Sequence, residues 1–80
     1  MQQCRVGSDV WSDGKGRVIY ISTKFFGTDF DGLRCLWETV VFVDDVPQHG
    51  MTLRTERYEV AQANHRAHVD FMHDHYPEGH

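Results

Sequence analysis

Hydrophobic and polar positions alternate over two long stretches of the chain. Residues 17–26 are rich in β-branched and aromatic side chains and contain no helix breaker, which predicts a strand. Residues 33–43 predict a second strand, with Trp37, Thr39 and Val41 on one face and Glu38 and Val40 on the other. A glycine-bounded loop at 27–32 joins them, so we expect an antiparallel hairpin.

Weaker patterns flank this hairpin. Residues 4–11 alternate weakly before a turn at 12–16, and residues 51–54 predict a short edge strand. From about Glu56 the period becomes helical, and the helix is expected to end before Pro77. One broad helical arc holds Val60, Ala61, His65, Ala67, His68, Val69, Phe71 and Met72. The sequence therefore predicts one α+β domain over residues 1–80, a three- to four-stranded antiparallel sheet packed by one long C-terminal helix.

Apolar residues occur on both faces of the second predicted strand. Phe25 and Phe26 are adjacent and are expected to point to opposite faces of the first. We therefore expect the helix to pack on one face of the sheet and another subunit or partner surface to cover the other face. Cys4 and Cys35 do not form a disulfide framework, and an 80-residue domain is small, so self-association as a homodimer is expected.

Charge and hydropathy narrow the classes of partner. The net charge is −4 with neutral histidines, which makes nucleic acid an unlikely partner. The N-terminus lacks the apolar core of a signal peptide, and the longest apolar stretch, residues 40–43, is too short to span a membrane. With reduced cysteines, these features predict a cytoplasmic protein without a membrane partner.

The histidines are the first candidates for chemistry. His65 and His68 lie three residues apart and share a helix face, so they could contribute to a zinc or nickel site. Without a third clear ligand, the favoured interpretation is that both pack at the boundary of sheet and helix, and no metal or cofactor is predicted. His73, His75 and His80 are expected to be solvated.

Glu38 is the second candidate, because it lies in an apolar strand. It could be an acid or base with a raised pKa. The favoured role is an ion pair with Arg34 on the same face, or with Arg54 or Arg57 across strands. No nucleophile or second acid accompanies it, so no catalytic residue and no enzyme activity are predicted.

Three segments resemble a family of small, uncharacterised proteins encoded by tailed phages. Residues 21–27 read ISTKFFG, residues 36–42 read LWETVVF, and residues 61–65 read AQANH. The family pattern is I-S-T-x-F-x-G, then [WF]-E-T-M-V-F, then R-Y-x-T before a helix with G-H. Here Val40 and Asn64 replace the family's methionine and glycine, and residues 5–15 lie outside the shared region. Residues 54–57 read RTER where the family has R-Y-x-T, so the tyrosine and the helix-capping threonine are absent. The resemblance implies a phage genome and the cytoplasm of an infected host cell.

Size, apolar faces and resemblance together predict an accessory interaction protein. It would bind a host or phage protein and inhibit a bacterial defence system, in the manner of anti-CRISPR proteins. One alternative is a dimeric binder that sequesters a nucleotide with Ser22, Thr23, Arg34, Arg54 and His65. Another is a metal-stabilised structural accessory protein. The expected binding residues are Phe25, Arg34, Trp37, Glu38, Arg54 and His65.

Overall fold

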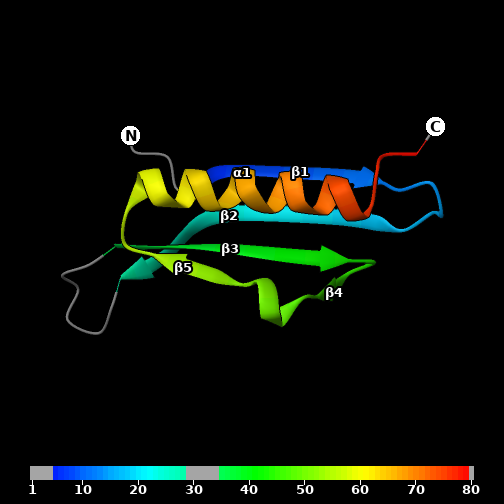
Figure 1. Cartoon of the computed structure of the whole chain (residues 1–80). Helices are drawn as coiled ribbons and strands as arrows, with labels where there is room; N and C mark the ends of the chain where they lie inside the picture. The colour runs from blue at the N-terminus through cyan, green and yellow to red at the C-terminus, as the bar shows by residue number, and fades with distance from the viewer. Residues whose placement is uncertain (1–4, 29–34, 80) are drawn as a thin grey trace.

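The chain forms one antiparallel sheet with a helix on one side (Figure 1). The computed structural model describes residues 5–28 and 35–79, and the side chains of 7–25 and 36–79. The elements are β1 (Arg5–Ser12), β2 (Val18–Thr28), β3 (Cys35–Val43), β4 (Val46–Pro47), the 3-10 helix η1 (His49–Met51), β5 (Leu53–Thr55) and α1 (Tyr58–His75). The predicted α+β class is confirmed.

Strand order follows the chain from β1 through β2 to β3. β4 and β5 both pair with β3, at opposite ends of that strand, with η1 between them. The predicted hairpin is confirmed, because β2 and β3 pair antiparallel with Tyr20 opposite Phe42 and Thr23 opposite Thr39. An irregularity between Phe25 and Gly27 shifts the register near the end of the hairpin.

The core lies between the sheet and α1. Trp11, Ile19, Ile21, Val41 and Met72 form one buried apolar cluster. Figure 1 shows α1 running along the strands and in the same direction as β1. Because Trp11 belongs to this cluster, β1 is an integral part of the fold, although residues 5–15 lie outside the segments that carry the family resemblance.

The helix begins later than its pattern predicts. Thr55 still pairs with Trp37 in the sheet, and Arg57 keeps an extended backbone, so the first helical residue is Tyr58. Ala61, His65 and Met72 are its buried residues. Val60 and Phe71 were expected on the packed arc but are 37% and 47% exposed, because the stripe that meets the sheet is narrower than the predicted arc.

The end of α1 is tied to the turn between β1 and β2. Trp11 Nε1 donates a hydrogen bond to the Tyr76 carbonyl oxygen at 2.8 Å, and the Gly79 N–H donates to the Ser12 carbonyl at 2.9 Å. The His73 ring stacks on Trp11 with centroids 3.8 Å apart. The prediction that His73 is solvated is therefore wrong, because its ring covers the indole. His80 lies outside the described residues, as do Cys4 and Arg34.

No helix in the described part of the chain has both the length and the apolar character needed to cross a membrane.

Candidate functional site

A chain of hydrogen bonds runs from the surface of β1 into the core through His65. His65 Nε2 lies 2.7 Å from Asp9 Oδ2, and Nδ1 lies 2.8 Å from Thr23 Oγ1. Thr23 Oγ1 in turn lies 2.6 Å from Thr39 Oγ1. The array exists because Thr23 and Thr39 are directly opposite in the hairpin, on the face that α1 covers.

The chemistry of the partners sets the direction of these bonds. An ionised carboxylate only accepts, so the His65 Nε2–H donates to Asp9. In the neutral ring, Nδ1 accepts from the Thr23 hydroxyl, which itself accepts from Thr39. The tautomer of His65 therefore fixes the orientation of two buried hydroxyl groups.

The order carboxylate, imidazole, hydroxyl is that of a nucleophilic triad. A catalytic hydroxyl, however, must reach the reacting carbon of its substrate. Thr23 is 0% exposed and Thr39 is 1% exposed, so neither hydroxyl meets a ligand. The array therefore serves to satisfy buried polar groups and to fix α1 on the sheet.

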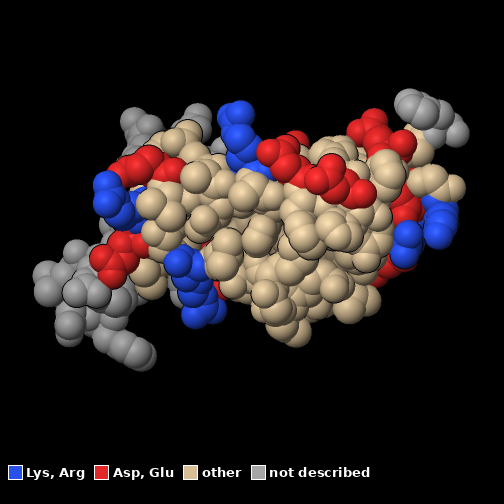
Figure 2. Space-filling model, in the orientation of Figure 1, with Lys and Arg blue, Asp and Glu red and all other residues tan. Residues whose placement is uncertain are grey.

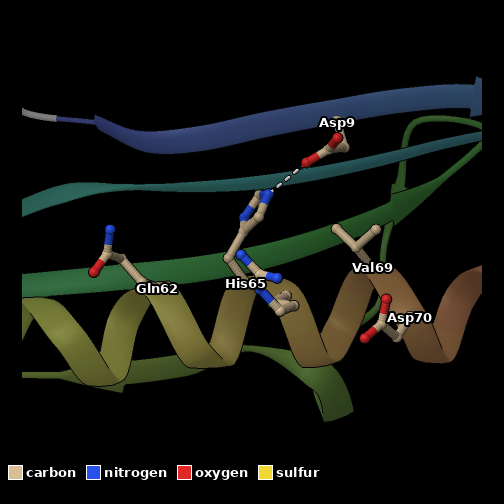
Figure 3. Close-up of a pocket in the computed structure, with 6 residues that line it drawn as sticks. Asp9, Gln62, His65, Val69 and Asp70 are labelled. Atoms are coloured by element: carbon tan, nitrogen blue, oxygen red, sulfur yellow. Dashed lines mark hydrogen bonds and ion pairs between the residues drawn. The ribbon is translucent and has the colours of Figure 1, made fainter.

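The outer end of this array opens into a hollow of about 380 Å³ (Figure 3). Asp9 reaches it from β1, and Gln62, His65, Val69 and Asp70 reach it from α1. Arg66 also lines it. Two carboxylates beside one guanidinium give the hollow no preference for an anion such as a phosphate.

No helix among the described residues lies over the other side of the sheet (Figure 1), and we call this side the open face. By register it carries Val10, Val18, Tyr20, Ser22, Lys24, Leu36, Glu38, Val40, Phe42, Pro47 and Arg54. Val10, Tyr20, Phe42 and Pro47 are consecutive neighbours across β1, β2, β3 and β4. Val10 is 63% exposed and Val18 is 42% exposed, so an apolar row crosses one end of this face.

The opposite end of the open face carries charge. Lys24 lies opposite Glu38, and Glu38 lies opposite Arg54. Arg54 Nε donates to Glu38 Oε2 at 2.8 Å, which confirms one of the ion pairs predicted for Glu38. Arg57 instead bonds Glu59. The open face therefore changes from a charged row at one end to an apolar row at the other.

The predicted binding residues do not form one surface in a single chain. Phe25, Trp37 and His65 lie on the side of α1, where the Phe25 and Trp37 rings meet edge to face. Glu38 and Arg54 lie on the open face. Arg34 lies outside the described residues. Binding through these residues stays a prediction.

The nucleotide pocket considered from the sequence is divided in the same way. Ser22 and Arg54 lie on the open face, whereas Thr23 and His65 lie beneath α1. The two faces alternate along β2, so neighbouring Ser22 and Thr23 cannot line one pocket within a chain.

The helical histidines are engaged in hydrogen bonds. His68 Nε2 lies 2.6 Å from the Met51 carbonyl oxygen and donates to it, so it does not join His65. His75 Nδ1 donates to the Phe71 carbonyl. Over residues 5–28 and 35–79, no group of three His, Cys, Asp or Glu side chains is arranged to hold a metal ion.

Surface charge on the side of the helix is dispersed. Lys and Arg side chains stand apart on the face in Figure 2, with acidic groups along its upper edge and an uncharged centre. No basic patch forms on the described part of this face, whereas binding to a phosphate backbone normally uses one.

Two carboxyl groups have perturbed pKa values. Burial alone would raise the pKa of Asp13, but hydrogen bonds from Arg17 and from the Lys15 N–H outweigh it and lower the pKa. A backbone hydrogen bond and the Arg57 guanidinium lower the pKa of Glu59. Both groups stabilise local structure, in the turn after β1 and the first turn of α1.

Several of these relationships were missed from the sequence. Asp9, Thr39 and Tyr20 were not singled out, and Phe42 was not linked to Tyr20. Cross-strand register would have linked Tyr20 to Phe42, because they are opposite in the predicted hairpin. No local signal connects Asp9 with His65, which are 56 residues apart.

Comparison with known proteins finds no matching family model, no similar curated protein and no similar solved structure. The resemblance to small phage proteins therefore stays a prediction that rests on its three sequence segments.

Proposed function

We propose that this chain is a non-catalytic interaction protein of phage origin that docks a protein partner on its open face. The single observation that carries the proposal is the apolar row formed by Val10, Tyr20, Phe42 and Pro47, which crosses β1 to β4 on the open face. Exposed apolar side chains that lie side by side are typical of protein contact surfaces.

The aromatic pair within this row supports the same proposal. Tyr20 and Phe42 lie with ring centroids 6.0 Å apart, and tyrosine and other aromatic residues are enriched at interaction hot spots. The burial of Thr23 supports a binding role over a catalytic one, since the hydroxyl next to His65 does not reach the surface. Phage origin and action in the host cytoplasm are supported by the sequence resemblance.

Within this class, we propose inhibition of a bacterial defence system, as in anti-CRISPR proteins, by occlusion of a partner surface. A plating assay tests it. A host that carries a CRISPR–Cas system should regain sensitivity to a targeted phage when the chain is expressed. The variant Val10→Arg places a charge on the open face and should lose this effect.

The matched control is Val60→Arg, which makes the same change at an exposed position on α1. This variant should protect the phage as well as the unmodified chain does. Failure of the unmodified chain to protect against any CRISPR–Cas system would remove the anti-CRISPR part of the proposal. Equal protection by Val10→Arg, with the variant folded, would remove the open face as its docking surface.

A further inference from the structure

A hollow of about 290 Å³ opens on the open face between Tyr20, Phe42 and Asp45. The two aromatic rings come from neighbouring strands and are inclined at 56° to one another. The carboxylate comes from the turn between β3 and β4. We call these three residues the cation cradle, because aromatic faces and a carboxylate both attract positive charge.

The turn explains how Asp45 is held at this place. Asp44 and Asp45 have positive φ angles of 51° and 66°, the geometry of a two-residue type I′ hairpin turn. Asp44 Oδ1 accepts a hydrogen bond from the Val18 N–H at 2.8 Å, so this carboxylate closes the turn onto β2. The Asp45 carboxylate makes no hydrogen bond or ion pair with any residue that the structure describes.

We infer that the cation cradle receives a lysine or arginine side chain of the protein that docks on the open face. This inference rests on the proposed function and specifies the chemistry of its partner. A cation in the hollow gains from the quadrupole of the ring face that it covers and from the nearby carboxylate. The hollow lies at the lower limit of small-molecule sites, which are about 300–1,000 Å³, and its lining of two aromatic rings and one carboxylate matches a single cationic side chain. The net charge of −4 also favours a basic partner.

A side-chain mimic tests the cradle without knowledge of the partner. Ethylguanidinium chloride is titrated into the labelled chain while the ring signals of Tyr20 and Phe42 are followed by NMR, with N-ethylurea as the neutral probe of the same shape. Ethylguanidinium should shift these signals along a saturable curve, and ethylurea should not. Equal shifts with both probes would overturn the inference, because the site would then not select positive charge.

Asp45→Asn removes the charge and keeps a residue that tolerates positive φ. It should weaken ethylguanidinium binding by about two- to fivefold, as expected for one exposed ion pair, and leave the melting temperature unchanged. Unchanged ethylguanidinium binding by this variant would also contradict the cradle. Glu59→Gln is the control, since it removes one exposed carboxylate from α1, away from the cradle.

Two further outcomes separate this inference from the proposed function. If Val10→Arg abolishes partner binding but Asp45→Asn does not, docking on the open face is supported and the cation cradle is contradicted. If the cation cradle binds ethylguanidinium but Val10→Arg leaves partner binding intact, docking of the partner on the open face is contradicted instead. A chain that sediments as a dimer and becomes monomeric with Asp45→Asn would show that a second copy fills the cradle, which overturns a separate partner as its occupant.

Discussion

His65 Nε2 donates a hydrogen bond to Asp9 Oδ2 over 2.7 Å and so joins the middle of α1 to β1. The same ring bonds the buried Thr23 hydroxyl through its other nitrogen. One imidazole thus links β1, the first element of the fold, to α1, the last. Removal of this ring should mainly lower the free energy of unfolding.

We predict that His65→Ala lowers the free energy of unfolding by about 2–3 kcal/mol, because it removes a buried ring and its hydrogen bond to the Thr23 hydroxyl. Asp9→Ala should cost about 0.5–1 kcal/mol, since that carboxylate is half exposed. Urea unfolding measures both. Gln62→Ala, at an exposed neighbour on the hollow, is the control and should change little. A negligible effect of His65→Ala would contradict the structural role of the array.

The hydrogen bonds of the Asp13 carboxylate predict a contribution to the free energy of unfolding that is lost at acidic pH. Its pKa is lowered below the ordinary 3.8 in the folded chain. A group of this kind stabilises the fold at pH values above its unfolded pKa and loses that effect as the pH falls through the folded pKa. The difference in unfolding free energy between the unmodified chain and Asp13→Asn should therefore be constant from pH 7 to 5. It should shrink below about pH 4. A difference in unfolding free energy that grows as the pH falls would contradict a lowered pKa of Asp13.

The close packing of Gly79 against the turn after β1 predicts a steric clash for any larger residue at this position. A Cβ atom at this position would lie 2.7 Å from the Asp13 carbonyl oxygen and from Gly14 Cα, both of which are backbone atoms. Gly79→Ala should therefore detach the tail from the turn at a cost of about 1–2 kcal/mol. Gly14→Ala is the matched control, because a Cβ there meets nothing within 4 Å. Thermal melts of the two variants should differ, and identical melts would show that the tail does not pack here.

The different surroundings of the two tryptophans predict that Trp→Phe lowers stability by different amounts at Trp11 and Trp37. Trp11 Nε1 bonds the Tyr76 carbonyl, whereas buried Trp37 Nε1 has no hydrogen-bond partner in the described part of the chain. Trp→Phe removes ring volume at both sites but removes a hydrogen bond only at Trp11. We expect Trp11→Phe to be the more destabilising by about 1 kcal/mol. Chemical denaturation checks this ranking, and the reverse order would be inconsistent with the structure.

The central hairpin and its pattern of faces could be predicted from the sequence, because period-two alternation over two long strands determines which side chains share a face. The same reasoning found the Glu38–Arg54 pair. The bond from Asp9 to His65 could not be found, since it depends on where α1 lies across β1. The position of Asp45 beside Tyr20 and Phe42 could not be predicted either, because aspartates in a turn are usually only turn formers.

The start of α1 shows the limit of local patterns. Thr55 and Glu56 look suitable for a helix start, yet pairing of Thr55 with Trp37 keeps the chain extended. Tertiary pairing therefore prevails over local preference at this boundary.

The most direct test of the open face starts with affinity purification of the partner protein from a host lysate. Its dissociation constant is then measured with the unmodified chain, Val10→Arg and Val60→Arg. All three proteins are first checked for the same melting cooperativity. The open face predicts that Val10→Arg weakens binding at least about tenfold, or roughly 1.4 kcal/mol, while Val60→Arg binds as the unmodified chain does. Weaker binding by Val60→Arg, with Val10→Arg unaffected, would contradict docking on the open face.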